Sequence, residues 1–130
     1  MSKTVLAVDD DPQIADKLAS LIESRGLSAV KAHDGLSALK IIRTQKIDLV
    51  TLDLVMPKLD GFKCARLFKF DERFAHIPVI AISHLSLKNV AEVAKGIGFE
   101  AFVQKPIKDQ DFFKALDTVI ARMERNRSWN

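Results

Sequence analysis

The sequence predicts an α/β fold in which a parallel sheet is covered by helices on both faces. Short apolar runs alternate strictly with amphipathic helical patterns, and this strand–helix repeat occurs five times along the 130 residues, with loops of ordinary length. The central run, Ile47–Val55, is almost continuously apolar, which is typical of a strand buried on both faces of a parallel sheet. Strict alternation favours such a sheet, with right-handed crossovers.

The overall composition is that of one soluble globular domain. An apolar fraction of 48% and a charged fraction of 28% are ordinary for that class, and 130 residues can bury a substantial core. No apolar run approaches the length of a membrane span, and the first residues, MSKTVLAV, lack the anatomy of a signal peptide. We therefore expect a cytoplasmic protein with no membrane partner.

Charge and cysteine content exclude several classes of function. The net charge of +3 is mildly basic and does not by itself indicate nucleic-acid binding. The single cysteine, Cys64, excludes an internal disulfide and a cysteine-rich metal site, and its helical pattern indicates a small buried side chain. Basic residues gather in two places that we expect to be solvated helix faces. They are Lys58, Lys63, Arg66, Lys69 and Arg73, and in the tail Arg122, Arg125 and Arg127.

The first helix has a clear start and a clear end. It follows a strand expected at Thr4–Val8. Asp11 before Pro12 is typical of an N-cap followed by a proline at the first helical position. The helix is expected to run to about Arg25, where Gly26 can end it.

The middle of the chain carries the second strand, the second helix and the central strand. The second strand is expected at Leu27–Lys31, and the pair Asp34-Gly35 opens a turn into a helix. The central strand then ends at an acid, Asp53. A loop with the turn pair Asp60-Gly61 leads into the third helix, whose apolar positions are Phe62, Ala65 and Phe68.

The last part of the chain completes the pattern. Pro78 precedes a buried strand at Val79–Ser83, and the fifth strand is expected at about Ala101–Val103. Asp109 can cap the last helix, and the tail Arg125–Asn130 is expected to be frayed beyond a domain that spans residues 1–124. The apolar helical positions are Leu87, Val90, Ala91 and Ala94 in the fourth helix and Phe112, Phe113, Leu116, Val119, Ile120 and Met123 in the fifth.

Polar side chains stand at the carboxyl ends of four of the predicted strands. Asp9 and Asp10 follow the first, Asp53 ends the third, Ser83 ends the fourth and Lys105 follows the fifth. In a doubly wound sheet these ends converge in one crevice. Clustered carboxylates favour a cation, and oxygen ligands suit Mg²⁺. An adjacent hydroxyl and ammonium suit a phosphoryl group, and an aspartate can itself be the nucleophile that accepts it.

Four segments of the chain resemble the receiver domain of two-component response regulators. They are VDDDP (Val8–Pro12), DLVTLDLVMPKLDG (Asp48–Gly61), IPVIAIS (Ile77–Ser83) and FVQKP (Phe102–Pro106). The resemblance covers about residues 3–123, and the four motifs in this order and spacing are highly specific. It implies a flavodoxin-like five-stranded sheet in the order 2-1-3-4-5 with five helices on its two faces.

The resemblance also implies a role for each polar strand-end residue. Asp53 would be the phosphoacceptor. Asp10 would bind Mg²⁺ directly and Asp9 through water, with the backbone carbonyl of Val55 as a further ligand. Lys105 would pair with the phosphoryl oxygens and, before phosphorylation, with Asp53. The peptide bond before Pro106 is typically cis in the family.

Conformational switching follows from the same resemblance. Ser83 would donate its hydroxyl to the phosphoryl group, and Phe102 would rotate into the space that Ser83 leaves. This would change the protein contacts of the fourth strand, the fourth helix, the fifth strand and the fifth helix. The phosphodonor would be a histidine kinase or a phosphotransfer protein, and the downstream partner would be a protein. We expect no nucleic-acid partner for this chain alone, and a weak homodimer stays open.

Two positions depart from the family pattern. His84 stands where the family usually has a small residue, and it could narrow the approach of the phosphodonor; an exposed histidine without a role is the simpler interpretation. Val55 has no polar group to orient an attacking water molecule, so we expect slow self-hydrolysis. The chain would be no enzyme in the ordinary sense, because it would catalyse only its own Mg²⁺-dependent phosphorylation and slow dephosphorylation.

Two other classes of protein compete with this interpretation. A haloacid-dehalogenase-like phosphatase also uses a strand-end aspartate, but it needs a second aspartate at the position of Val55. No glycine-rich phosphate loop follows the first strand, so nucleotide binding is unsupported. A phosphorylation-independent interaction module on the same fold is the main alternative. A single-domain regulator and a receiver from a longer protein also both stay open.

Overall fold

The five predicted strands form one parallel sheet. The strands are β1 (Thr4–Val8), β2 (Ser28–Ala32), β3 (Leu49–Asp53), β4 (Val79–Ser83) and β5 (Ala101–Gln104). Their order across the sheet is β2-β1-β3-β4-β5, and every neighbouring pair is parallel. This computed structural model, which describes residues 3–57, 59–93 and 96–128, therefore confirms the predicted doubly wound topology.

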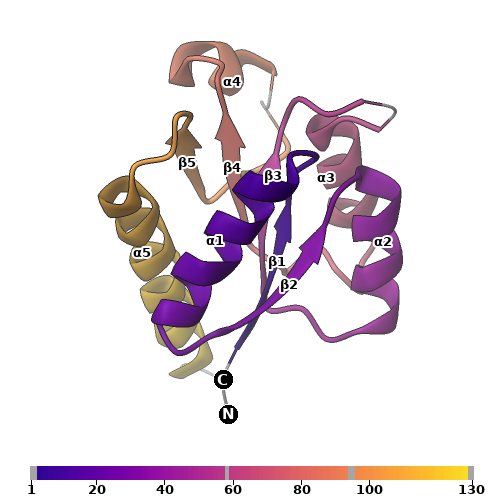
Figure 1. Ribbon diagram of the computed structural model, residues 1–130. Coiled ribbons are helices and arrows are strands. Elements are labelled where there is room, and N and C mark those ends of the chain that lie inside the picture. The colour runs from indigo at the N-terminus through magenta and orange to yellow at the C-terminus, as the bar shows by residue number, and fades with distance from the viewer. Residues whose placement is uncertain (1–2, 58, 94–95, 129–130) are drawn as a thin grey trace.

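Helices cover both faces of the sheet (Figure 1). They are α1 (Pro12–Ser24), α2 (Gly35–Thr44), α3 (Gly61–Lys69), α4 (Leu87–Val93) and α5 (Asp109–Ser128). Helices α1 and α5 lie on one face, and their apolar side chains form one core with that face. Helices α2, α3 and α4 belong to a second core on the other face. None of the helices in the described part of the chain combines the length and apolar character that a membrane crossing requires.

The strands divide their side chains between these two cores by strict alternation. In β1, Val5 and Ala7 face α1 and α5, whereas Leu6 and Val8 face α2 and α3. Every residue of β3 and β4 is buried. The central strands are apolar on both faces because helices cover both faces, as the continuous apolar run predicts.

The starts of three helices are capped by aspartates. Asp11 accepts a hydrogen bond from Gln13 N–H and precedes Pro12, as predicted. Asp34 caps α2 in the same way, with a 2.7 Å hydrogen bond from Ser37 N–H. Asp60 caps α3 with a 2.9 Å hydrogen bond from Lys63 N–H. The predicted turn at Asp60-Gly61 is thus also the start of a helix.

Some element boundaries differ from the prediction. Strand β2 lies one residue later than predicted, because it pairs with β1 from Ser28 to Ala32. Asp109 is the first residue of α5 and not its cap, so its charge lies in the first helical turn. Helix α5 continues to Ser128, so the predicted tail is helical up to that residue, and its fraying stays a prediction. The predicted helical residue Ala94 and the basic residue Lys58 lie outside the described residues.

Candidate functional site

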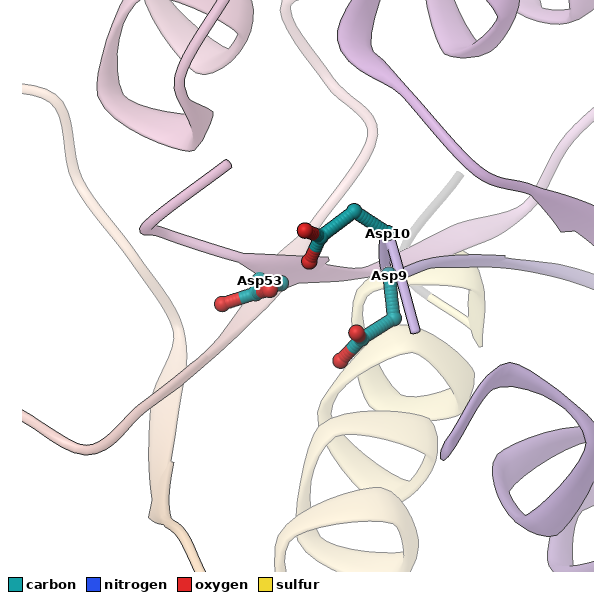
Figure 2. A group of neighbouring side chains, drawn as sticks. All are labelled: Asp9, Asp10 and Asp53. Carbon is teal, nitrogen blue, oxygen red and sulfur yellow. The ribbon is translucent and has the colours of Figure 1, made fainter. Parts of the chain in front are cut away.

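Three carboxylates gather where β1 and β3 end. Asp9 and Asp10 directly follow β1, and Asp53 is the last residue of β3. Figure 2 shows the three side chains grouped at this edge, and one oxygen of each lies within 4.8 Å of the others. Asp9 and Asp53 are buried, whereas Asp10 is exposed. The sheet topology thus brings together acids that lie more than forty residues apart in the sequence.

Lys105 places a buried ammonium group between two of these acids. Its Nζ atom lies 2.9 Å from Asp9 Oδ2 and 3.4 Å from Asp53 Oδ2. The side chain of Lys105 is only 6% exposed, and that of Asp9 is fully buried. The expectation from the sequence was a pair between Lys105 and Asp53, but the shorter contact is the one with Asp9.

The two carboxylate oxygens of Asp9 make different contacts. Its Oδ1 atom accepts a 2.9 Å hydrogen bond from the backbone N–H of Asp11. Its Oδ2 atom is in ion-pair contact with Lys105, but this contact lacks hydrogen-bond geometry, so Oδ2 has no hydrogen-bond donor among the described residues. Lys105 offsets the negative charge of this buried oxygen, and a water molecule can supply the missing hydrogen bond.

Asp53 is a buried carboxylate with a perturbed affinity for protons. Burial raises its pKa from 3.8 to about 6, and the negative charge of Asp9 adds to this increase. The charge of Lys105 and a 3.2 Å hydrogen bond from Val55 N–H act in the opposite direction. Near neutral pH the carboxylate is therefore largely ionised, although the protein has removed most of its water.

The pKa of Lys105 lies above the ordinary value for a lysine. Burial acts to lower it and is the largest single influence. The contacts with Asp9 and Asp53 together outweigh burial, so the side chain stays charged. A positive charge is thus permanently present beside Asp53.

The chemistry of these donors fits a divalent cation of the Mg²⁺ type. All of them are carboxylate oxygens, which are the hard ligands that Mg²⁺ prefers. The Oδ2 atom of Asp9 lacks a hydrogen-bond donor among the described residues, and exposed Asp10 leaves room for the water molecules that Mg²⁺ retains.

Ser83 and Phe102 lie on the other face of the sheet. Alternation along β3 assigns Asp53 to the face of α1 and α5, together with Leu49. Along β4 and β5, the same rule assigns Ser83 and Phe102 to the face of α2, α3 and α4. The two predicted switch residues therefore share a layer with each other and not with Asp53.

The immediate contacts of Ser83 and Phe102 differ in polarity. The buried Ser83 hydroxyl accepts a 3.0 Å hydrogen bond from Leu85 N–H, and Ser83 O accepts one of 2.8 Å from Lys105 N–H. Phe102 is half-buried and borders an apolar hollow of about 370 Å³ beside α4. Leu87, Val90, Ala91, Gly96, Gly98, Phe99 and Ala101 complete the lining of this hollow.

Other predicted positions take simpler roles. His84 is exposed, directly after β4. Cys64 is fully buried, as predicted, and burial raises its pKa to about 12. The peptide bond between Lys105 and Pro106 is cis.

Sequence reasoning missed one residue that shapes the site. A Cβ atom on Gly61 would lie 2.2 Å from Asp53 O and 2.6 Å from Leu54 Cα, so only glycine fits there. The start of α3 can therefore pack directly on the backbone of the strand that carries Asp53. The pair Asp60-Gly61 was visible as a turn, but the close approach of two backbones has no sequence signal.

The fold and the acidic site at the sheet edge define a class of signalling domain. The family model described as the response regulator receiver domain matches residues 5–117. The chain belongs to this family, and it is therefore a receiver domain of the two-component response regulators.

Relatives of similar length support this assignment. The polar-differentiation response regulator DivK of Brucella ovis is 31% identical over 120 residues, which cover 92% of this chain and 98% of that protein. DivK of Brucella anthropi is 30% identical over the same coverage.

Solved structures share the fold. The receiver domain of the Francisella response regulator 1452 is 29% identical, with a TM-score of 0.82 over 94% of this chain and 99% of that one. The chemotaxis protein CheY4 of Vibrio cholerae, at 23% identity, has a TM-score of 0.86 over 92% of this chain and 99% of that one, and this likeness concerns the fold alone.

Proposed function

We propose that Asp53 accepts a phosphoryl group from the phosphohistidine of a histidine kinase or a phosphotransfer protein. The observation that carries this proposal is the buried group of Asp9, Lys105 and Asp53 at the carboxyl edge of the sheet. In this group the ionisable nucleophile, Asp53, lies beside the fixed positive charge of Lys105. The donor acts on the chain in the cytoplasm, and the phosphorylated chain in turn acts on a downstream protein.

The transfer is a substitution at phosphorus. A carboxylate oxygen of Asp53 forms the new P–O bond, the P–N bond to the donor histidine breaks, and its electron pair returns to the imidazole. Lys105, already 3.4 Å from Asp53 Oδ2, compensates the charge of the phosphoryl oxygens. Because Asp9 also holds Lys105, the ammonium can shift between the two acids without leaving the site.

Mg²⁺ would be held by the carboxylates of Asp10 and Asp53 and by the backbone carbonyl of Val55, with Asp9 acting through water. Asp9 Oδ1 already accepts a hydrogen bond from Asp11 N–H, whereas Oδ2 has no hydrogen-bond donor among the described residues and can accept one from a water molecule on the ion, which supports an indirect role for Asp9. When bound, the ion supplies positive charge that stabilises the transferring phosphoryl group. Val55 is 61% exposed and has no polar side-chain group to orient water, so the acyl phosphate hydrolyses slowly.

Phosphorylation changes contacts on the other face through Ser83 and Phe102. A phosphoryl group can shift a conformational equilibrium only by binding one state better. The Ser83 hydroxyl accepts a hydrogen bond from Leu85 N–H, and the loop after β4 moves so that the same hydroxyl donates its O–H to the phosphoryl group. Phe102 then takes the vacated space, and the surface around its hollow beside α4 changes.

The test is intact mass after incubation with a small acyl phosphate and Mg²⁺. We expect one added phosphoryl group in the wild-type chain and none in Asp53→Asn. Lys105→Gln, which keeps a polar side chain but loses the ammonium, should be phosphorylated more slowly than the wild type.

Absence of the adduct in a wild-type chain that still binds Mg²⁺ would contradict the proposal. It would instead favour a phosphorylation-independent interaction module, unless His84→Ala restores the adduct. In that case exposed His84 would obstruct the donor.

A further inference from the structure

The outer surface of α3 exposes two large apolar side chains that neither the site nor the switch uses. Leu67 is 54% exposed and Phe70, directly after the helix, is 77% exposed. They line a shallow hollow with four charged residues, and we call it the α3 hollow. Its lining is Arg66, Leu67, Phe70, Asp71, Glu72 and Arg73.

Helices α2 and α3 carry charge of only one sign. Their sequences, GLSALKIIRT and GFKCARLFK, contain Lys40, Arg43, Lys63, Arg66 and Lys69 but neither aspartate nor glutamate. Lys69 is engaged, because its ammonium donates hydrogen bonds to the carbonyls of Ala75 and Ile77. The other four are exposed, and Arg66 has no ion-pair partner among the described residues.

The rim of the α3 hollow is organised by charge. Arg73 donates two side-chain hydrogen bonds to Asp71 and lies 4.8 Å above the ring of Phe74. These hydrogen bonds are the main reason why the pKa of Asp71 is lowered to about 2. The positive charge of Arg43 in α2 also lowers this pKa. Arg66 of α3 therefore borders the two exposed apolar side chains, and Arg43 of α2 adds positive charge near Asp71.

We propose that the α3 hollow binds an amphipathic helix of a partner protein that presents an apolar side chain flanked by carboxylates. The apolar side chain would cover Leu67 and Phe70, and the carboxylates would meet Arg66 and the other exposed cations along α2 and α3. Asp71 and Glu72 stand in the same rim, and they would repel a uniformly anionic lipid surface or nucleic acid. Because the rim of the α3 hollow carries charges of both signs, it suits one apolar side chain of a partner with carboxylates on selected sides.

This surface is separate from the phosphoacceptor site and its switch. It lies at the C-terminal end of α3, whereas Gly61 at the other end packs against Asp53. At about 1.5 Å per residue, the nine residues between them span about 13 Å. The partner would therefore bind at a place that phosphorylation of Asp53 does not cover.

The test uses two synthetic helical peptides, one with leucine on one face flanked by glutamate and one with lysine in place of every glutamate. We expect the acidic peptide to bind at least about tenfold more tightly than the basic one. Amide shifts of the isotope-labelled chain should concentrate in α2, α3 and residues 70–73. Phe70→Ala and Arg66→Glu should each weaken binding about tenfold, because both change exposed contact residues.

The matched control is Leu87→Ala, which removes a similarly exposed side chain (61%) from α4. It should bind the acidic peptide as the wild type does, and circular dichroism should show that all variants are folded. Equal binding of the two peptides, or shifts centred on α4 and α5, would overturn the proposal. Two other results would also overturn the proposal, provided that Phe70→Ala abolishes them. One is binding to phosphatidylserine vesicles without peptide binding, and the other is formation of a dimer of this chain without peptide binding.

Discussion

Helices α1 and α5 cover one face of the sheet with paired charges, whereas α2 and α3 cover the other with charges of one sign. On the first face, ion pairs join Lys17 to Asp109 and Arg25 to Asp117. On the second face, Leu67 and Phe70 are exposed beside Arg66, which has no ion-pair partner among the described residues. The face of α1 and α5 therefore pairs some of its charges internally, whereas α2 and α3 carry exposed charges of one sign.

The difference continues inside the protein. Alternation along β3 and β4 assigns Asp53 to the side of α1 and α5 and Ser83 to the opposite side, where Phe102 packs. The four predictions that follow test how far the two layers differ, from the largest expected effect to the smallest.

Removing the same side chain from each layer compares how well the two cores are packed. Phe112 of α5 is 0% exposed and Phe68 of α3 is 1% exposed. Phe112→Ala and Phe68→Ala should each lower the free energy of unfolding by about 3–5 kcal/mol, measured in urea. A cost for Phe68→Ala of less than about 1.5 kcal/mol would mean that the layer under α3 is loosely packed.

Gly61→Ala tests the contact between α3 and the strand that carries Asp53. The added methyl group would lie 2.2 Å from Asp53 O, so helix or strand must move, at a cost of about 2–3 kcal/mol. Gly26→Ala is the control, because Gly26 has open space and only a positive φ of 77°, which costs about 1–2 kcal/mol. Denaturant unfolding measures both variants. A smaller cost for Gly61→Ala than for Gly26→Ala would contradict the close approach.

The raised pKa of Asp53 makes stability depend on pH in a defined direction. Between about 4 and 6, the folded chain binds a proton at Asp53 that the unfolded chain has lost, so stability falls as pH rises through this window. Asp53→Asn removes the ionisation and should stabilise the chain by about 1–3 kcal/mol at high pH without Mg²⁺. The gain should vanish near pH 4, where the unfolded carboxyl is protonated as well.

Thermal unfolding in a chelator at several pH values measures this effect, and added Mg²⁺ should reverse it by stabilising the wild type alone. A gain that is the same at every pH would assign the effect to packing and not to the charge of Asp53.

Arg25→Ala and Arg66→Ala compare a paired with an unpaired arginine. Arg25 lies 3.3 Å from Asp117 and 4.0 Å above the ring of Phe113, so its loss should cost about 1 kcal/mol. Arg66 has no ion-pair partner among the described residues, so its loss should change stability by less than about 0.5 kcal/mol. Equal costs, measured by denaturant unfolding, would show that charge pairing does not distinguish the two faces.

Much of the fold could be predicted because each strand–helix repeat is locally consistent. The apolar runs at Val79–Ser83 and in the centre of the chain have one reasonable structure, and Asp11 with Pro12 marks a helix start by local chemistry. The predicted ends of an element were wrong where its local sequence pattern is weak. Strand β2 is half-exposed at the edge of the sheet, so its pairing with β1 and not its own pattern sets its ends.

The residues of the candidate site could be predicted from the sequence, but the distances between their atoms could not. Sequence order brings Asp9, Asp53 and Lys105 to one edge, yet it cannot decide which acid the lysine approaches more closely. The close approach of Gly61 to Asp53 is invisible for the same reason. Both depend on side-chain and backbone positions within about 1 Å, which only tertiary packing determines.

The ammonium of Lys105 has a consequence for how the protein responds to its ionic surroundings. A dissolved cation occupies an acidic pocket only in proportion to its concentration, whereas this one is tethered covalently beside Asp9 and Asp53 and cannot be diluted. Exposed pairs such as Lys17 with Asp109 weaken as electrolyte is added, but buried ones are screened far less. The acidic edge of the sheet thus carries its own counter-ion, and its charge balance stays constant while that of the surface changes.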